Sequence, residues 1–499
     1  METFGKRNLI LLFVLSVLSF AVMGYHPGAE DDTVYVTAVK ADLNPALYPH
    51  DSEFFKLQVK TSVFDNWMAD FVRATHISVA WSELLWQFLS VYFILLGGWA
   101  IICRLFTEPS ARWGAVALLG AMLTLPVAGT GLYLVDQYLH PRNPATALIL
   151  FALDRILAGR RWQALPLLIL AFILHPLMGA FGVSFAAFLA VVTCDPVHEF
   201  LSGWLLRPLP HASLPAAALI PFGWVLGTPS QAWMDSMRPR HLFWLYHWEW
   251  YEWLGAIAPL FLFWLLARYA ASRGENTLAK LATALFLYGA FQQCIALVIL
   301  SPWAPIGLTT LEPMRYLHVI YIFLVLIAGA YLGKHLLKRH AWRWAVLLAV
   351  ANGGMFFAQR QLFAASPAVE FPGQRTANPW LQAFRWIRHN TPQNAYFAID
   401  PHYESDPGED WHSFRALAER SVLADAYKDG ATVTKMPSIA NIWETQVRAQ
   451  DGWNHFQLAD FERLKTQFGV NWVMVSYPHP PAGLNCLWHN ASLTVCRVP

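Results

Sequence analysis

Three consecutive acidic residues, Glu30, Asp31 and Asp32, follow the first apolar run of the chain. Adjacent carboxylates repel one another, so this run is not explained by stability. One carboxylate can accept the proton of an attacking hydroxyl while its neighbour binds a metal ion or orients the acceptor. Short acidic runs are also common in solvated loops, so the pattern alone leaves a chemical and a structural interpretation open.

The composition predicts an integral membrane protein around these acids. Of 499 residues, 56% are hydrophobic and 14% are charged, whereas soluble domains have about 25% charged residues. Lys and Arg number 35 and Asp and Glu number 33, a net charge of +2 that argues against a nucleic-acid partner. The sequence has no Walker loop, no dinucleotide glycine fingerprint and no His-Glu-x-x-His motif, which argues against ATP-driven transport, hydride transfer and zincin proteolysis.

Apolar runs predict about eleven membrane-spanning helices. The first, 8–24, follows Lys6 and Arg7, and we interpret it as an uncleaved helix because Ala21-Val-Met23 is a weak signal-peptide cleavage site. The other runs lie at 84–106, 112–128, 143–158, 162–175, 177–193, 212–228, 252–271, 279–301, 314–334 and 342–359. Several are shorter than the roughly 20 residues that a perpendicular span needs. Short, proline-broken helices need protein or a cavity around them, which indicates a site within the outer half of the membrane.

Loop charges predict the orientation of these helices. With residue 1 in the cytoplasm, the basic loops fall inside, as the positive-inside rule requires. Their basic residues are Arg104, Arg112, Arg160, Arg161, Arg207, Arg268, Arg273, Lys280, Lys334, Lys338, Arg339 and Arg343. The long loop 25–83 and everything after about residue 360 then lie outside, together with loops 129–142, 229–251 and 302–313.

The composition changes near Ser366, where charge increases and no further spanning run follows. Short apolar runs at 395–399, 421–424 and 472–476 predict buried strands. Between and before these runs, helices are predicted at 380–390, 439–449 and 458–468. We therefore expect a transmembrane domain over 1–365 and a small extracytoplasmic α/β domain over 366–499. Cys486 and Cys496 could pair there in an oxidising compartment.

This arrangement resembles the GT-C superfamily of polytopic membrane glycosyltransferases, which use polyprenyl-phosphate sugars. The resemblance rests on a basic N-terminus, one helix, an outer loop that starts with Asp31-Asp32-Thr-Val-Tyr35, many short helices and an outer C-terminal domain. His26-Pro27 is similar to the His-Pro-acid loop of members that use mannosyl phosphate lipids. The segments 24–55, 312–318 and 386–392 resemble most closely a bacterial branch of unassigned function. Many relatives have Glu where Asp32 stands, and Glu30 is additional, so the catalytic member is open.

The resemblance implies an inverting sugar transfer from a polyprenyl phosphate to a glycan, lipid or protein at the outer face of a bacterial inner membrane. Asp31 matches the general base, with Asp32 as its partner, and a divalent metal is compatible with these acids although no ligand set is assigned. Cations must stabilise the departing phosphate. Candidate substrate-binding residues are His26, Glu30, Asp136, Arg142, Arg238, Arg240, Arg315 and His318. Arg315 is the first choice for the phosphate, and its other interpretation is an interfacial anchor.

Two alternatives stay open. A transporter or lipid-translocating protein would have the same hydrophobic body but would need ionisable residues near the membrane midplane, whereas the acids here follow the end of a helix. A glycosyltransferase-like scaffold without activity would keep the same carboxylates, so whether the chain is an enzyme is undecided. The aromatic segment 233–253 predicts an amphipathic interfacial helix, with a sugar or lipid platform as the other interpretation.

Overall fold

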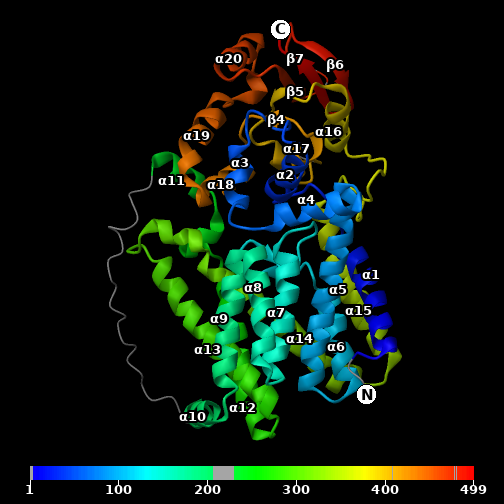
Figure 1. Ribbon diagram of the computed structural model, residues 1–499, viewed down its shortest axis with the longest axis vertical. Helices are drawn as coiled ribbons and strands as arrows, with labels where there is room; N and C mark the ends of the chain where they lie inside the picture. Colours follow the sequence, from blue (N-terminus) through cyan, green and yellow to red (C-terminus); the bar gives the residue numbers. More distant parts are fainter. Residues whose placement is uncertain (1–3, 206–229, 407, 477, 479) are drawn as a thin grey trace.

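The computed structural model describes residues 4–205, 230–406, 408–476, 478 and 480–499. A bundle of helices forms one end of the elongated molecule, and a smaller region with a sheet forms the other (Figure 1). The start of the chain lies at the far end of the bundle from that sheet (Figure 1). Within the described residues, six segments are long and apolar enough to cross a membrane. They are α1 (Lys6–Met23), α5 (Val79–Leu105), α12 (Trp250–Ser272), α13 (Asn276–Ile299), the run Ile306–Leu337 that contains α14 (Leu317–Tyr331), and α15 (Ala341–Leu362).

The predicted count of about eleven spans is not confirmed. Four predicted spans are helices of fewer than 18 residues, and the run 212–228 lies outside the described residues. These four are α6 (Pro109–Ala121), α7 (Arg142–Leu157), α8 (Arg161–Leu174) and α9 (Pro176–Val192). They nevertheless pack within the bundle, α7 on α5 and α8, and α6 on α14 (Figure 1). Helices α8 and α9 are separate because the residue before a proline avoids helical geometry, and His175 has φ −145° and ψ 92°.

Residues 25–78, which we call the first loop, are folded rather than extended. They form α2 (Asp32–Leu43), α3 (Glu53–Val59) and α4 (Phe64–Thr75). These helices share a core that includes Val39, Phe55 and Met68. In Figure 1 they lie between the bundle and the sheet, and α2 packs against α17 (Phe414–Ala418). The first loop and residues 366–499, the C-terminal region, therefore lie at the same end of the bundle.

The C-terminal region contains the predicted sheet, which has five strands in the order β4-β3-β5-β7-β6. The strands are β3 (Tyr396–Ala398), β4 (Ser421–Val422), β5 (Trp472–Ser476), β6 (Asn485–His489) and β7 (Leu493–Arg497). Strand β3 is parallel to β4 and β5, and β7 is antiparallel to β5 and β6. Helix α16 (Pro379–Asn390) covers one face and α20 (Leu458–Phe468) the other, which explains the uninterrupted apolar strands. A disulfide joins Cys486 and Cys496 on neighbouring strands.

The remaining elements connect these parts. Strands β1 (Pro126–Val127) and β2 (Leu132–Tyr133) form a short antiparallel pair before α7. Helix α10 (Asp195–Leu205) follows α9, whereas α18 (Lys428–Lys435) and α19 (Ala440–Ala449) belong to the C-terminal region.

The aromatic segment 233–253 is not the single amphipathic helix that its composition predicts. Helix α11 (Gln231–Met237) ends before Pro239, which has no backbone N–H to continue the helical hydrogen bonds, and two short 3-10 turns precede α12. Trp233 is buried against residues of the C-terminal region, and its indole donates to the carbonyl oxygen of Thr434. Tyr246 and Trp250 are exposed, so the segment divides its aromatic side chains between a core and the surface.

Candidate functional site

A cavity of about 200 Å³ opens where the first loop, the bundle and the C-terminal region meet. We call it the polar cavity because nine of its lining residues are charged. Its acidic lining residues are Glu30, Asp31, Asp136 and Glu312, and its basic ones are Arg142, Arg240, Arg315, Lys428 and Lys435. They come from positions at or just before helix starts and from α18, so one end of the bundle gathers them.

Three of the four acids in the polar cavity are paired with a cation. The pairs are Glu30 with Lys428, Asp136 with Arg142 and Glu312 with Arg315. Asp136 and Arg142 form a fork with distances of 3.0 and 2.5 Å. Nε of Arg315 lies 3.0 Å from Glu312, but neither atom makes a hydrogen bond within the described part of the chain, so the angle is poor. The Nε–H of Arg315 is therefore available to a ligand.

Asp31 is the remaining acid, and its only ion-pair partner among the described residues is His140. The Asp31 side chain is 39% exposed, and its Oδ2 lies 3.4 Å from Nε2 of His140. Nδ1 of His140 accepts the backbone N–H of Arg142 at 3.0 Å, so the ring carries its proton on Nε2, facing Asp31. The fold thus presents the Asp31 carboxylate to the polar cavity, with the His140 ring behind it.

The charge state of Asp31 follows from these neighbours. Burial opposes its ionisation, but the hydrogen bond from His140 and the positive charges of Lys435 and Arg142 hold the pKa of Asp31 well below its usual range. Burial, followed by the charge of Arg142, lowers the pKa of His140 and keeps the ring neutral. Asp31 is consequently ionised at neutral pH.

Strained backbone fixes the position of Asp31. Glu30 has φ 52°, and its N–H donates to the carbonyl oxygen of Trp411, which itself has φ 60° next to Asp410 at 63°. A non-glycine residue in this region costs of order 1–3 kcal/mol and persists only when its surroundings impose it. The first loop and the C-terminal region therefore hold each other in an unfavourable backbone conformation directly beside the polar cavity.

Asp32 does not line the polar cavity. Its side chain is buried, and its Oδ2 accepts the backbone N–H of Gly28 at 2.7 Å, which closes the turn before α2. Burial, then the neighbouring carboxylates of Glu83 and Asp31, raise the pKa of Asp32. The geometry therefore favours Asp31 for a role at the substrate and gives Asp32 a role in shaping the turn.

The other residues predicted from the sequence divide into two groups. Glu30, Asp136, Arg142, Arg240 and Arg315 line the polar cavity together with Asp31. His26, His318 and Arg238 do not line it. His318 is buried and donates from Nε2 to the carbonyl oxygen of Leu134 at 2.9 Å, and Arg238 is exposed and paired with Asp235. His26 lies behind Phe363, which stacks on its ring and itself lines the polar cavity.

Sequence reasoning missed Lys428, Lys435, His140 and Trp411. The two lysines lie seven residues apart on α18, a spacing that brings side chains to one helix face and could have identified them as a pair. Lys435 forms no ion pair with any residue that the structure describes. His140 gives no signal in the sequence, because its tautomer depends on a backbone contact.

The polar cavity does not fit a resident metal ion. Three of its four carboxylates are paired with arginine or lysine, and among the described residues no three metal-ligating atoms come together there. One group of potential ligands does exist, His26, Glu370 and His412, but it lies behind Phe363 rather than in the polar cavity. Any reaction in the polar cavity is therefore derived from the side chains alone.

Comparisons with known proteins give little sequence similarity. Residues 378–431 match a family described as a domain of unknown function (DUF6798), and no curated protein matches the chain. The archaeal oligosaccharyltransferase AglB from Archaeoglobus fulgidus, in complex with an inhibitory peptide and a dolichol-phosphate, is similar with 13% identity and a TM-score of 0.45 over 95% of this chain and 70% of its own. The arabinofuranosyltransferase AftD from Mycobacteria is similar with 14% identity and a TM-score of 0.45 over 100% of this chain and 40% of its own. Both belong to the GT-C superfamily that the sequence resembles, but likeness at these TM-scores carries no argument about activity.

Proposed function

We propose that this protein is an inverting membrane glycosyltransferase that transfers a sugar from a polyprenyl phosphate to an acceptor hydroxyl or amide. One observation carries the proposal: Asp31, a carboxylate without a lysine or arginine partner among the described residues, shares the polar cavity with the cations Arg240, Arg315 and Lys435. That combination serves a reaction in which one partner gives up a proton and the other leaves as a phosphate.

The proposed reaction is a direct displacement. The acceptor oxygen or nitrogen attacks the anomeric carbon as its proton passes to Asp31, and the bond from that carbon to the phosphate oxygen breaks. The electron pair leaves with the polyprenyl phosphate, whose negative charge Arg315, Arg240 and Lys435 stabilise. His140 orients the Asp31 carboxylate by its hydrogen bond and takes no proton from the substrate.

Membrane placement supports a donor that arrives from lipid. Residues before α2 and on α18 line the polar cavity, and both helices lie beyond the bundle end that is opposite the start of the chain (Figure 1). The other end carries basic residues such as Arg104, Arg112 and Lys334. The positive-inside rule assigns the basic end to the cytoplasm, so we place the polar cavity and the C-terminal region on the periplasmic side.

The transporter alternative receives no support from the described spans. In α1, α5, α12, α13 and α15 every Asp, Glu, Lys and Arg lies near a helix end, and α14 contains none. A transporter needs such groups near the membrane midplane. The charge distribution therefore favours chemistry at one membrane surface.

Arg315→Ala is expected to weaken binding of a short polyprenyl phosphate about 10–100-fold, since a charge-assisted hydrogen bond contributes roughly 1.5–3 kcal/mol. Arg315→Lys should fall between the variant and the wild type, because lysine keeps the charge but loses the planar fork. Titration of farnesyl phosphate into the detergent-solubilised protein measures this affinity, and farnesol tests whether the phosphate is required. Arg238→Ala is the control, since Arg238 is exposed outside the polar cavity. Equal affinities for Arg315→Ala and Arg238→Ala would contradict the phosphate role.

His140→Ala is expected to shift the acidic limb of the pH–activity profile to higher pH. In the wild type the pKa of Asp31 is held low, so Asp31 stays ionised and kcat/KM should remain level as pH falls from 7 to about 5, above the ordinary aspartate pKa of about 3.9. Loss of the His140 hydrogen bond raises that pKa, and protonation then begins at higher pH. A profile of kcat/KM against pH for both proteins measures the shift. Superimposable acidic limbs would show that His140 does not tune Asp31.

A further inference from the structure

We propose that His26, Glu370 and His412 bind one divalent transition metal ion, with Zn²⁺ the best fit, in a buried three-ligand site behind the polar cavity. The ion would join the first loop to the C-terminal region. This inference is independent of the proposed glycosyltransferase activity, because it concerns a site that touches no substrate.

The three side chains already lie at near-coordinating distances. Nδ1 of His26 is 2.8 Å and Nε2 of His412 is 3.0 Å from the same oxygen, Oε1 of Glu370. All three residues are buried, and their ligand atoms lie within 4.8 Å of one another. Two imidazoles and a carboxylate form a donor set that Zn²⁺ binds at about 2.0–2.2 Å, so a small outward shift of the ligands accommodates the ion.

The hydrogen bonds of His412 orient a lone pair into the site. Nδ1 of His412 lies 2.9 Å from the carbonyl oxygen of Glu409, which can only accept, so Nδ1 carries the proton. In the neutral ring, Nε2 then directs a lone pair at the Glu370 carboxylate 3.0 Å away. Two electron-rich atoms at this distance require a cation between them, either a proton or a metal ion.

His26 can also direct the lone pair of one ring nitrogen at Glu370 while the other ring nitrogen carries the proton. Its Nε2 contacts the side-chain amide of Gln359, whose Oε1 is buried and has no hydrogen-bond partner in the described part of the chain. Exchange of the amide oxygen and nitrogen lets Oε1 accept from Nε2–H of His26, which turns the Nδ1 lone pair of His26 towards Glu370. Metal-ligating histidines characteristically donate their second N–H to a carbonyl or carboxylate in this way.

The backbone around the site shows which segments a bound ion would hold together. Isolated bridges pair Tyr25 with Val369 and Ala29 with His412, so the three ligands come from three adjoining segments. His412 directly follows Trp411, which receives the Glu30 N–H beside the polar cavity. The ring of Phe363 stacks on His26 at 3.7 Å and closes the side that faces the polar cavity. A buried ion bound by these three segments would hold the strained Glu30–Asp31 turn in place.

Metal binding to the full chain in detergent, prepared without a polyhistidine tag and stripped with a chelator, tests the site. Titration with Zn²⁺, and with Co²⁺ as a visible probe, is expected to reach about one ion per chain, with nitrogen-ligand absorption bands for Co²⁺. His412→Ala and Glu370→Gln should each weaken binding more than about 100-fold, since even outer-shell changes cost 10–100-fold. His455→Ala, which removes an exposed histidine elsewhere in the C-terminal region, should bind as the wild type does.

The titration of the wild-type protein tests whether the site binds a metal ion even if a variant fails to fold. Absence of stoichiometric metal in the wild type would overturn the site and leave a proton as the cation that holds the three side chains together. Unchanged metal content in folded His412→Ala would equally overturn it. Neither result bears on sugar transfer, which is measured separately.

Discussion

Asp31→Asn is expected to lower the rate of sugar transfer about 10²–10⁴-fold, the usual contribution of a positioned general base. Asparagine keeps the size of the side chain and can still contact His140, but it cannot take the proton of the acceptor. Binding of farnesyl phosphate should persist, because the cations Arg315, Arg240 and Lys435 are untouched. The assay uses membranes that contain the protein and a polyprenyl phosphate that carries a radiolabelled sugar. The radioactivity that appears in the lipid, glycan and protein fractions measures the rate of transfer.

The matched control for this variant is Asp70→Asn, which changes the same chemical group on α4 at a side chain that is 73% exposed and paired with Arg73. It should transfer sugar as the wild type does. Transfer by Asp31→Asn within about twofold of the wild type would remove Asp31 from the reaction. A wild type that binds the phosphate yet transfers no sugar to any fraction would indicate a scaffold without activity, contrary to the proposed function.

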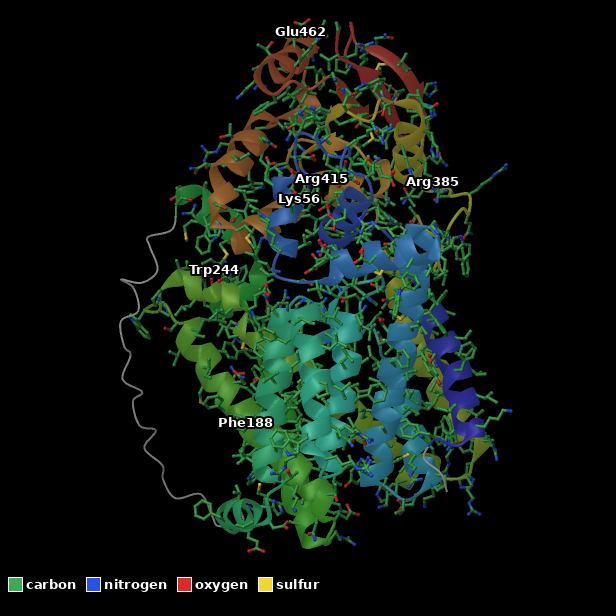
Figure 2. The ribbon with its side chains drawn as sticks, viewed as in Figure 1. Lys56, Phe188, Trp244, Arg385, Arg415 and Glu462 are labelled. Carbon is green, nitrogen blue, oxygen red and sulfur yellow. A yellow bond between two sulfur atoms is a disulfide. The ribbon has the colours of Figure 1, made fainter. Side chains whose placement is uncertain are left out.

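Arg415→Met is expected to cost about 3–5 kcal/mol of stability, the loss observed when one partner of a buried ion pair is removed. Nε of Arg415 lies 2.5 Å from Asp51, and its two Nη atoms lie 2.6 and 2.9 Å from Asp429. All three side chains are buried, so the variant leaves two carboxylates without a counter-charge. Figure 2 places Arg415 where the first loop meets the C-terminal region. Thermal unfolding followed by tryptophan fluorescence in detergent measures the loss.

Arg385→Met is the control for Arg415, because Arg385 is exposed on α16 (Figure 2) and should change stability by less than about 0.5 kcal/mol. A triple variant, Arg415→Met with Asp51→Asn and Asp429→Asn, should recover part of the loss, since no buried charge is then left uncompensated. Equal unfolding temperatures for Arg415→Met and Arg385→Met would show that the ion network contributes nothing.

The sequence predicted those features that depend on neighbours in the chain. Apolar runs located most helices of the bundle, and the short runs 395–399 and 472–476 became β3 and β5. The span count was not confirmed because helices such as α8 and α9 are short and broken at His175-Pro176. Periodicity marks an apolar helix but does not tell whether it crosses the membrane alone or is supported by neighbours.

The candidate site was predictable only in part for the same reason. Asp31 and Arg315 were identified because each stands beside the start or end of an apolar run. Lys428 and Lys435 were missed because nothing local indicates that α18 lies against the first loop, and Glu30 pairs with Lys428 across 398 positions. His26 was expected at the substrate but lies behind Phe363, a stacking contact that no spacing in the sequence encodes.

The long sequence separation between Glu30 and Lys428 has a consequence for biosynthesis. A ribosome delivers α1 to α15 to the membrane before it has made Trp411, Lys428 or Lys435, so the growing chain carries Asp31 in an unfinished pocket. The helices of the bundle can therefore be inserted into the membrane before the C-terminal residues that line the polar cavity exist. A nascent chain released before α18 would carry the bundle without Lys428 and Lys435, so the lining of the polar cavity is complete only once α18 has been translated.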